Sequence, residues 1–259
     1  MKRDPSSGIR LPVRYDRVCS FGHYCVTAFY LKRHYLRSSS GPFDWCAQDG
    51  GGLADYVRLV CTDFDGFLRR ESLEPMVNAR SSQDDLDCDY YRNRETGFMF
   101  LHDFPVGIPL DESYGEVRAK YDRRIERFYR QARSGRTLLV FQTRMSSPAS
   151  AEIVRAIGDL RGKMGDGVDL LVVEDVPDME GLSFAEPAPG AYHVRCRYFR
   201  PEIDWRLGDS SVCDRIYGAI RCRGKFRIWA RKRWLKLRAA FHLTSERRRA
   251  ARKALLGEK

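Results

Sequence analysis

Short apolar runs that alternate with amphipathic segments constrain the fold of this chain more than any other feature. Strand-like runs occur at residues 15–21, 97–101, 138–142, 170–174 and 192–198. Helical periodicity fills the intervals at residues 26–36, 53–68, 114–133 and 149–164. Near-continuous apolar strands followed by helices are typical of a mostly parallel sheet covered on both faces. We therefore expect a three-layer α/β fold.

The C-terminal segment differs from the rest in charge. Residues 221–259 hold 15 Lys and Arg against two acids, whereas the other 220 residues hold 31 Lys and Arg against 33 Asp and Glu. Apolar residues recur there at spacings of four, four, three and four, at Phe226, Ala230, Trp234, Leu237 and Phe241. This pattern predicts a basic amphipathic helix. We expect a flexible lead-in over 1–12, an α/β domain over 13–210 and a basic helical tail over 211–259.

A basic amphipathic helix with tryptophan on its apolar face favours an anionic membrane surface as its partner. The residues expected to contact a membrane or another polyanion are Arg231, Lys232, Arg233, Trp234, Lys236 and Arg238. Packing of the apolar face on the body is an equal alternative. Nucleic acid is less favoured, because the whole charge excess is confined to this tail.

Cysteine spacing and the N-terminal residues indicate a reducing compartment. The eight cysteines form no CxxC pair, so neither a zinc ribbon nor a thioredoxin motif is expected, and we predict no bound metal. Residues 1–10 are polar, and no apolar run reaches the roughly 20 residues that span a bilayer. We therefore expect a cytoplasmic protein, peripheral to the inner face of the membrane where the tail binds.

The first candidate for chemistry is Cys25, which follows the strand-like run at 15–21 and the glycine at Gly22. Its position predicts the first turn of a helix, where unpaired backbone N–H groups and the helix dipole favour a thiolate. Gly22 is expected to provide an unusual backbone angle at the strand end. The alternative is a small buried cysteine, since free cysteines are often buried.

The second candidate is His102, which follows the run at 97–101. Ligand sites in open α/β sheets collect at the carboxyl ends of strands, so Cys25 and His102 are expected at one sheet edge. His102 would then act as general base. Asp103 or Asp44 would orient its ring, and a structural role for His102 at the strand end is the alternative.

Several neighbouring residues are expected to support this site. His23 is more suited to a backbone hydrogen bond in the turn than to catalysis. Asp44 lies between Phe43 and Trp45, two aromatic residues that anchor the loop in apolar surface. A helix-capping role in a packed corner fits Asp44 equally well. No nucleotide-binding signature is present, neither GxxxxGK[ST] nor GxGxxG, and no cofactor is expected.

The ordered strings YDRVCSFGHYC, LKRHYLRSSSGPFDW, LVCTDFDGFL, FMFLHDF and KYDRRIERF together resemble a bacterial family of papain-like cysteine peptidases, a domain of unknown function. The resemblance covers residues 15–141 and weakens toward residue 200. It implies Cys25, His102 and Asp103 as the catalytic set. It implies Ser20, Gly22, Phe43, Asp44 and Trp45 as framework. It also implies a papain-like α+β architecture as the alternative fold.

Two enzymatic hypotheses share these residues. The first is a cysteine-dependent hydrolase acting on a peptide, glycan or small-molecule acyl group. The second is an acyltransferase in surface-polysaccharide biosynthesis with an acyl-coenzyme A donor, suggested by a similarity in outline to proteins of that kind. A basic groove beside Cys25 would favour the transferase. A binding protein without catalysis, acting at a membrane or on nucleic acid, is the third hypothesis.

Overall fold

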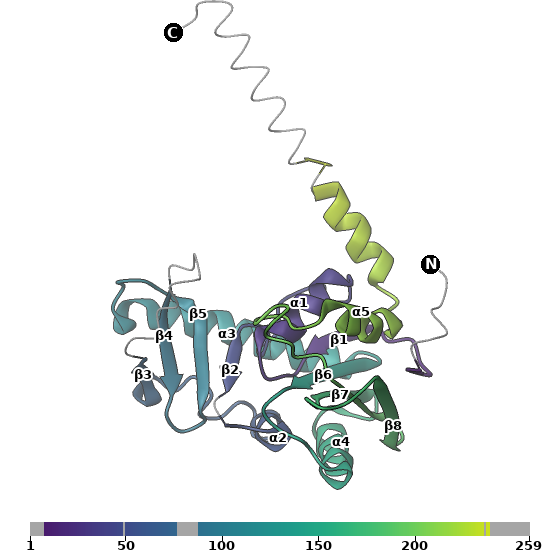
Figure 1. The fold of residues 1–259 in the computed structure, drawn as a ribbon. Helices are drawn as coiled ribbons and strands as arrows, with labels where there is room; N and C mark the ends of the chain where they lie inside the picture. The colour runs from purple at the N-terminus through teal and green to yellow at the C-terminus, as the bar shows by residue number, and fades with distance from the viewer. Residues whose placement is uncertain (1–7, 49, 77–87, 236, 239–259) are drawn as a thin grey trace, which may run out of the picture.

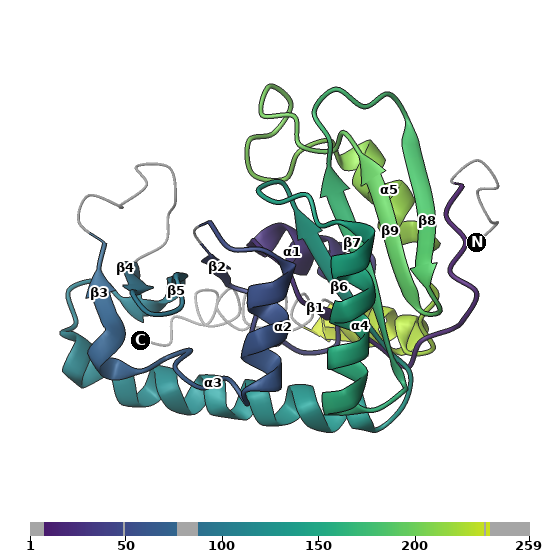
Figure 2. The ribbon, with the colours of Figure 1, turned by 90° about the horizontal axis from the view of Figure 1, so that it is seen from below.

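The computed structural model describes residues 8–48, 50–76, 88–235 and 237–238, and it contains two sheets that lie side by side (Figures 1 and 2). In chain order the elements are β1 (Arg17–Ser20), α1 (Cys25–Arg33), β2 (Cys46–Gln48), α2 (Leu53–Cys61), the 3₁₀ turn η2 (Arg70–Ser72), β3 (Leu73–Pro75), β4 (Cys88–Asn93), β5 (Phe98–Pro105), α3 (Leu110–Arg133), β6 (Thr137–Thr143), α4 (Ser150–Met164), β7 (Val168–Asp175), β8 (Leu182–Ala188), β9 (Ala191–Cys196) and α5 (Ser210–Ala219).

The first sheet has five strands in the order β1-β6-β7-β9-β8. Strands β1, β6, β7 and β9 are parallel, and β8 pairs antiparallel with β9 at the edge. The prediction of a mostly parallel sheet is confirmed, because four of the five predicted apolar runs form its parallel strands. The strand β8 was not predicted, because its burial is partial and its sequence lacks a continuous apolar run.

Side chains of the central strands alternate between two apolar cores on opposite faces of this sheet. Leu139, Phe141, Leu170 and Val172 belong to the core that also contains residues of α2, α3 and α4. Leu138, Val140, Leu171 and Val173 belong to the core shared with α1 and α5. Both faces are therefore covered, which explains why these strands read as unbroken apolar runs.

The second sheet corrects the sequence interpretation of residues 97–101. That run forms part of β5, which belongs to an antiparallel sheet in the order β2-β5-β4-β3 rather than to the parallel sheet. A short apolar run alone does not distinguish a parallel strand from a hairpin strand. The deciding information lies in the preceding turn, where Gly97 has a φ of 71° and Asn93 accepts backbone hydrogen bonds from Glu95 and Thr96.

Helix α3 connects the two sheets physically. It runs along both of them (Figure 2), and its residues belong to one continuous core with residues of both sheets. The Tyr121 ring packs against Phe67 and Phe100, with centroid distances of 5.6 and 5.5 Å. Nearer its end, Phe128 lies 6.1 Å from the Phe43 ring. The two sheets thus share a core.

Helix α5 extends the body beyond the predicted boundary at residue 210. Its residues Cys213, Ile216 and Tyr217 are fully buried, and Asp214 forms an ion pair with Arg33 of α1 at 2.8 Å. At the other end of the chain, residues 9 and 11 of the predicted lead-in are also buried. A further helical segment over 225–235 projects from the body (Figure 1). The predicted helix beyond residue 238 lies outside the described residues.

Candidate functional site

Cys25 is the first residue of α1, as the sequence predicts. The preceding residue, Tyr24, has extended backbone angles and provides no side-chain cap, and the first turn of α1 contains no acidic residue. The backbone N–H groups of that turn are therefore not neutralised by a local carboxylate or hydroxyl cap. Such a helix start favours a negatively charged group placed against it.

Gly22 positions this helix start, but for a reason different from the predicted one. Its φ does not lie in the left-handed region. A Cβ atom at Gly22 would lie 2.6 Å from the backbone nitrogen of Gln142 and 3.1 Å from the Cα of Phe141. The glycine is therefore required because the turn after β1 passes directly against β6.

His23 is a structural residue of the same turn. Its ring is fully buried, with Nδ1 3.2 Å from the Thr143 hydroxyl and Nε2 3.1 Å from the backbone oxygen of Gln48. Burial lowers its pKa below the ordinary value of 6.5. The ring stacks on Tyr24 at 5.2 Å. His23 thus links the turn before Cys25 to β6 and to β2, and the predicted backbone hydrogen bond is present.

His102 lies on β5, so the prediction that it shares one sheet edge with Cys25 is wrong. Its strand contains a bulge: Asp89 pairs with Phe104 and Tyr91 pairs with Phe100, so β5 carries two more residues than β4 across this interval. Bulges redirect side chains and are common beside active sites. The His102 ring is half-buried and packs edge-on against Trp45, with a centroid distance of 5.7 Å.

The segment 45–48 connects the surroundings of the two candidate residues. At one end Trp45 contacts the His102 ring, and at the other the Gln48 carbonyl accepts a hydrogen bond from Nε2 of His23 at 3.1 Å. His23 precedes Cys25 by two residues. The segment 45–48 therefore contacts both His102 and the turn before Cys25, although His102 lies in the four-stranded sheet and Cys25 begins α1 after the five-stranded sheet.

Asp103 contacts α3 in this structure. The Tyr121 hydroxyl donates to its Oδ2 at 2.7 Å, and the Lys120 ammonium lies 2.6 Å from Oδ1. The Arg124 guanidinium lies 3.8 Å from the same oxygen. Adjacent residues of an extended strand point in opposite directions, and these contacts turn Asp103 toward α3. Its role in the structure is to hold the bulged part of β5 against that helix.

Asp44 is also engaged locally. It is almost fully buried, pairs with Arg37 and accepts a hydrogen bond from the backbone N–H of Gly41 at 2.9 Å. Burial raises its pKa, and the Arg37 guanidinium opposes this shift. Arg37 in turn lies over the Trp45 ring at 5.4 Å. This is the packed corner that the sequence left open as an alternative.

Burial raises the pKa of six thiols, which are Cys19, Cys46, Cys61, Cys196, Cys213 and Cys222. For Cys19 and Cys213 the pKa rises to about 12, so both remain protonated at neutral pH. Of the eight cysteines, all of which lie in the described residues, Cys25 is the one that begins a helix.

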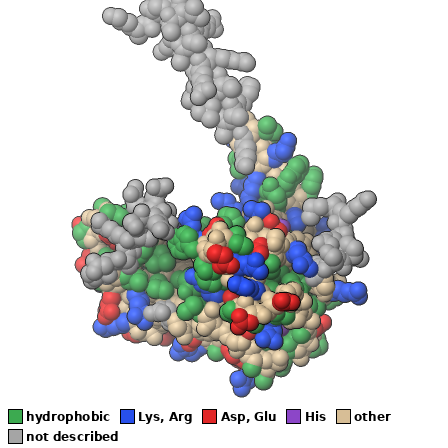
Figure 3. Space-filling model, in the orientation of Figure 1, with side chains coloured by type: hydrophobic (Ala, Val, Ile, Leu, Met, Phe, Trp, Pro, Cys, Tyr) green, Lys and Arg blue, Asp and Glu red, His purple; other side chains and the backbone are tan. Residues whose placement is uncertain are grey.

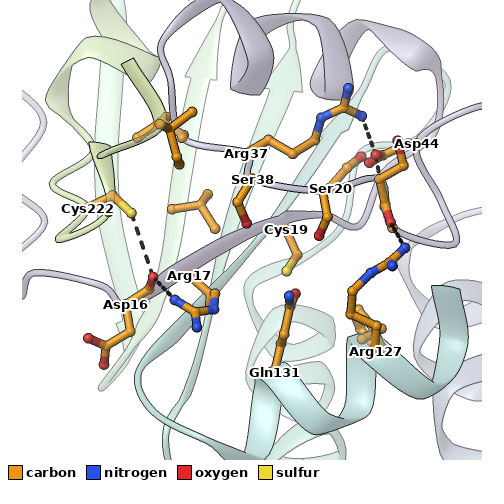
Figure 4. Close-up of a pocket in the computed structure, with 18 of the residues that line it drawn as sticks. Asp16, Arg17, Cys19, Ser20, Arg37, Ser38, Asp44, Arg127, Gln131 and Cys222 are labelled. Atoms are coloured by element: carbon orange, nitrogen blue, oxygen red, sulfur yellow. Dashed lines mark hydrogen bonds and ion pairs between the residues drawn. The ribbon is translucent and has the colours of Figure 1, made fainter. Parts of the chain in front are cut away.

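A cavity of about 610 Å³ lies along the edge strand β1, and neither Cys25 nor His102 lines it. Figure 4 shows Cys19, Ser20, Arg127 and Gln131 around this space, contributed by β1 and α3. The sequence analysis missed the α3 side of the cavity. The available signal was the spacing of residues 124, 127 and 131, which places three polar side chains along one side of the helix. This cavity has basic lining residues, but Cys25 is not among the residues that line it. It is therefore not the basic groove beside Cys25 that would favour acyl transfer.

The segment 225–235 exposes much of its apolar surface. Exposed fractions are 73% for Phe226, 56% for Trp234 and, at residue 237, 63% for Leu237. Packing of that predicted face against the body is therefore not observed. Figure 3 shows hydrophobic side chains on the projecting helix, with Lys and Arg side chains near its base. Of the predicted contact residues, Lys236 lies outside the described residues.

A second buried polar cluster was not predicted. The Nε2 atom of His193 lies 2.7 Å from Oε2 of Glu174, and the Ser147 hydroxyl donates to the other carboxylate oxygen. Arg195 lies 3.4 Å from the same Glu174 Oε2. The carboxylate separates the serine from the histidine, so this order does not place a base on the Ser147 hydroxyl.

Within the ranges that the structure describes, no group of three or more His, Cys, Asp or Glu side chains is arranged to hold a metal ion. Over the same ranges, no helix combines the length and the apolarity needed to cross a bilayer.

Comparisons with known proteins place this geometry in context. The family model described as "Putative papain-like cysteine peptidase" matches residues 16–171. An uncharacterized protein of Acanthamoeba polyphaga mimivirus is 30% identical over 154 residues, which cover 54% of this chain and 68% of the viral protein. No solved structure matches the chain significantly. The matched span includes Cys25, His102 and Asp103 and ends before the basic C-terminal segment.

Proposed function

We propose that this chain, which belongs to the family described as "Putative papain-like cysteine peptidase", is a cysteine-dependent hydrolase with the Cys25 thiol as nucleophile and His102 as general base. The observation that carries the proposal is the position of Cys25 at an uncapped helix start. Burial raises the pKa of six of the other seven thiols, which disfavours the nucleophilic thiolate form in them.

The proposed reaction proceeds through an acyl-enzyme. His102 takes the proton of the Cys25 thiol, and Sγ attacks the acyl carbon, which forms a carbon–sulfur bond. The bond to the leaving group breaks, and His102 returns the proton to that group. Water, deprotonated by His102, then attacks the thioester, which releases the carboxylic acid and restores the thiol. Backbone N–H groups at the start of α1 would stabilise the oxyanion in both steps.

In this proposal the contacts of His102 and Asp103 assign them different roles. The Trp45 ring supports the His102 imidazole edge-on, and the bulge in β5 directs it. Asp103 acts as a positioning residue, because its carboxylate is held by Tyr121 and Lys120 of α3. It fixes the bulged backbone on which His102 is carried, and so departs from the orienting role that the family resemblance implies.

The experiment that tests the proposal detects the acyl-enzyme directly. The full chain is incubated with p-nitrophenyl acetate and with a peptide thioester, and acylated peptides are identified by mass spectrometry. We expect acyl groups on Cys25 and release of acid. In Cys25→Ala and in His102→Ala, turnover should fall by at least about a hundredfold, as expected for loss of a nucleophile or base.

Cys88→Ala is the matched control, because Cys88 lies on β4 and not at a helix start. Undiminished turnover in Cys25→Ala, or acylation confined to another cysteine, contradicts the proposal. Added amine or alcohol acceptors distinguish hydrolysis from transfer. Acylated acceptor as the main product would identify an acyltransferase with the same nucleophile.

We also propose that the segment 225–238 holds the protein against an anionic membrane surface, with the body on the cytoplasmic side. Exposed apolar residues, among them Phe226 and Trp234, accompany Arg231 and Lys232 on this segment. Tryptophan and basic residues together favour the membrane interface. Trp234→Ser should reduce sedimentation of the full chain with anionic vesicles, whereas Trp205→Ser, at a residue that is 49% exposed elsewhere, should not. Equal losses in both variants would contradict this role.

A further inference from the structure

We propose that the cavity along β1 binds the phosphate group of a small molecule. The cavity lies at the edge of the five-stranded sheet, where β1 has a partner strand on one side only. It is enclosed by β1, the loop 36–44, α3 and the helical segment 225–235. Its volume of about 610 Å³ is typical of a small-molecule site.

Positive charge dominates the lining of this cavity. Two carboxylates face seven basic side chains, which are Arg17, Arg37, Arg124, Arg127, Arg227, Arg231 and Lys232. The basic residues come from four separate segments of the chain, so they approach the cavity from different directions. Arginine is well suited to this task, because its planar guanidinium can donate two parallel hydrogen bonds to phosphate oxygens.

The two carboxylates are already neutralised by their neighbours. Asp44 pairs with Arg37 and accepts the Gly41 N–H. Asp16 accepts a hydrogen bond from the backbone N–H of Arg136 at 3.0 Å and pairs with Arg223 at 3.1 Å. Seven basic side chains against these two carboxylates leave the lining with a net positive charge, which favours an anionic ligand.

One buried polar atom of the lining lacks a hydrogen-bond partner among the described residues. It is the Ser20 hydroxyl, and the residue is only 2% exposed. A buried polar group without a partner is costly, so the Ser20 hydroxyl points to a ligand that completes its hydrogen bond.

The loop 37–41 adds further donors. Its sequence is Arg-Ser-Ser-Ser-Gly, and Ser38, Ser39 and Ser40 all line the cavity. The backbone oxygen of Ser40 accepts a hydrogen bond from Arg127 at 2.8 Å, which holds the loop against α3. Serine hydroxyls beside arginines match the several acceptor oxygens of a phosphate group.

This site is distinct from the proposed catalytic centre. Cys25 and His102 do not line the cavity, and the one thiol of β1 that does, Cys19, has a pKa raised to about 12 by burial. The cavity is therefore equipped to bind an anion and not to attack an acyl carbon. The inference does not depend on the proposed hydrolase activity.

Calorimetric titration of the full chain with inorganic pyrophosphate tests the proposal. We expect binding that weakens as salt rises. Arg127→Gln should weaken it by at least about tenfold, and Ser20→Ala by about threefold to tenfold, as expected for losing a charged and a neutral hydrogen bond. Arg130→Gln is the matched control on α3, because Arg130 is 67% exposed and pairs with Glu126. The affinity of Arg130→Gln for pyrophosphate should equal that of the unmodified chain.

Arg17→Gln provides a second variant in case Arg127→Gln does not fold, since Arg17 is exposed and its guanidinium donates to the backbone oxygen of Asp16 at 3.0 Å. Vesicles distinguish a lipid headgroup from a soluble ligand. If the phosphate belongs to a lipid, phosphatidylcholine vesicles with phosphatidic acid should bind better than those with phosphatidylserine, and Ser20→Ala should remove the difference. Failure of both probes to bind, or equal losses in Arg130→Gln, overturns the proposal.

Discussion

The two sheets hold the two candidate catalytic residues in different ways. Cys25 follows the five-stranded sheet, where every residue of β6 is buried and Gly22 is pressed against the β6 backbone. His102 lies within β5, whose residues alternate between buried and half-exposed and whose pairing with β4 is interrupted by a bulge. The position of Cys25 thus depends on dense packing, whereas that of His102 depends on the Trp45 ring and on the polar contacts of the neighbouring Asp103.

Substitutions in the two sheets should therefore have different consequences. A substitution that disturbs the five-stranded sheet should unfold the whole molecule, because its strands separate both cores. A substitution in the bulged part of β5 should displace His102 at a smaller cost in stability.

The largest effect is expected for Gly22→Ala. The added methyl group would lie 2.6 Å from the backbone nitrogen of Gln142, so β1 and β6 would have to separate. We expect a loss of about 3 kcal/mol in the free energy of unfolding, measured by urea titration. Gly158→Ala is the control, because a Cβ at this position of α4 meets nothing within 4 Å. That variant should gain up to about 1 kcal/mol, and similar losses in both would refute the packing argument.

A smaller effect is expected for Asp103→Asn. The substitution removes the charge that Lys120 and Arg124 face, and it weakens the hydrogen bond from Tyr121. We expect the free energy of unfolding to fall by about 2 kcal/mol. Asp122→Asn, on α3, should change it by less than about 1 kcal/mol, because that carboxylate is 51% exposed.

The Asp103→Asn variant also distinguishes two roles for Asp103, which are anchoring the β5 backbone and orienting the His102 imidazole. If Asp103 only anchors β5, the folded Asp103→Asn protein should keep the pH profile of Cys25 reactivity and lose rate. A displaced pH profile would show that this carboxylate acts on the imidazole itself, and the assignment of Asp103 to α3 would then be wrong.

The smallest effect concerns pH and His23. Burial lowers the pKa of this ring below 6.5, so the unfolded chain binds a proton more readily than the folded chain does. The resulting stability is fully present above pH 6.5 and is lost as pH falls below it, by up to about 1.4 kcal/mol per pH unit. Urea titrations of His23→Gln should show a shallower acid dependence than the unmodified chain. An unchanged slope would contradict the buried neutral state.

The sequence predicted the parallel part of the fold better than the antiparallel part. The runs at 138–142 and 170–174 are apolar throughout because both of their faces are covered, and such runs admit few other placements. The run at 97–101 is equally apolar, yet β5 joins a second sheet because of the turn at Asn93 and Gly97. The residue types of that turn can be recognised in the sequence. The pairing of β5 with β2 cannot, because β2 is short and distant in the chain.

The candidate site likewise has features that local sequence predicts and features that depend on contacts between distant segments. The helix start at Cys25 follows from local sequence, since a strand and a glycine precede it. The contact between Trp45 and His102 depends on pairing between segments that are distant in the chain, and so does the cavity formed by Ser20 and Arg127. Contacts of that kind become visible only when the two sheets are assembled.

The pH dependence of Cys25 alkylation tests the central claim most directly. Iodoacetamide is applied to the full chain and to His102→Ala over a range of pH, and the modification of Cys25 is followed by peptide mass spectrometry, with Cys88 as an internal comparison. The account predicts a midpoint for Cys25 clearly below the roughly 8.5 of an ordinary thiol, and an upward displacement of that midpoint in His102→Ala. A midpoint near that of an ordinary thiol, unaltered by His102→Ala, would contradict the assignment of Cys25 and His102 as nucleophile and base.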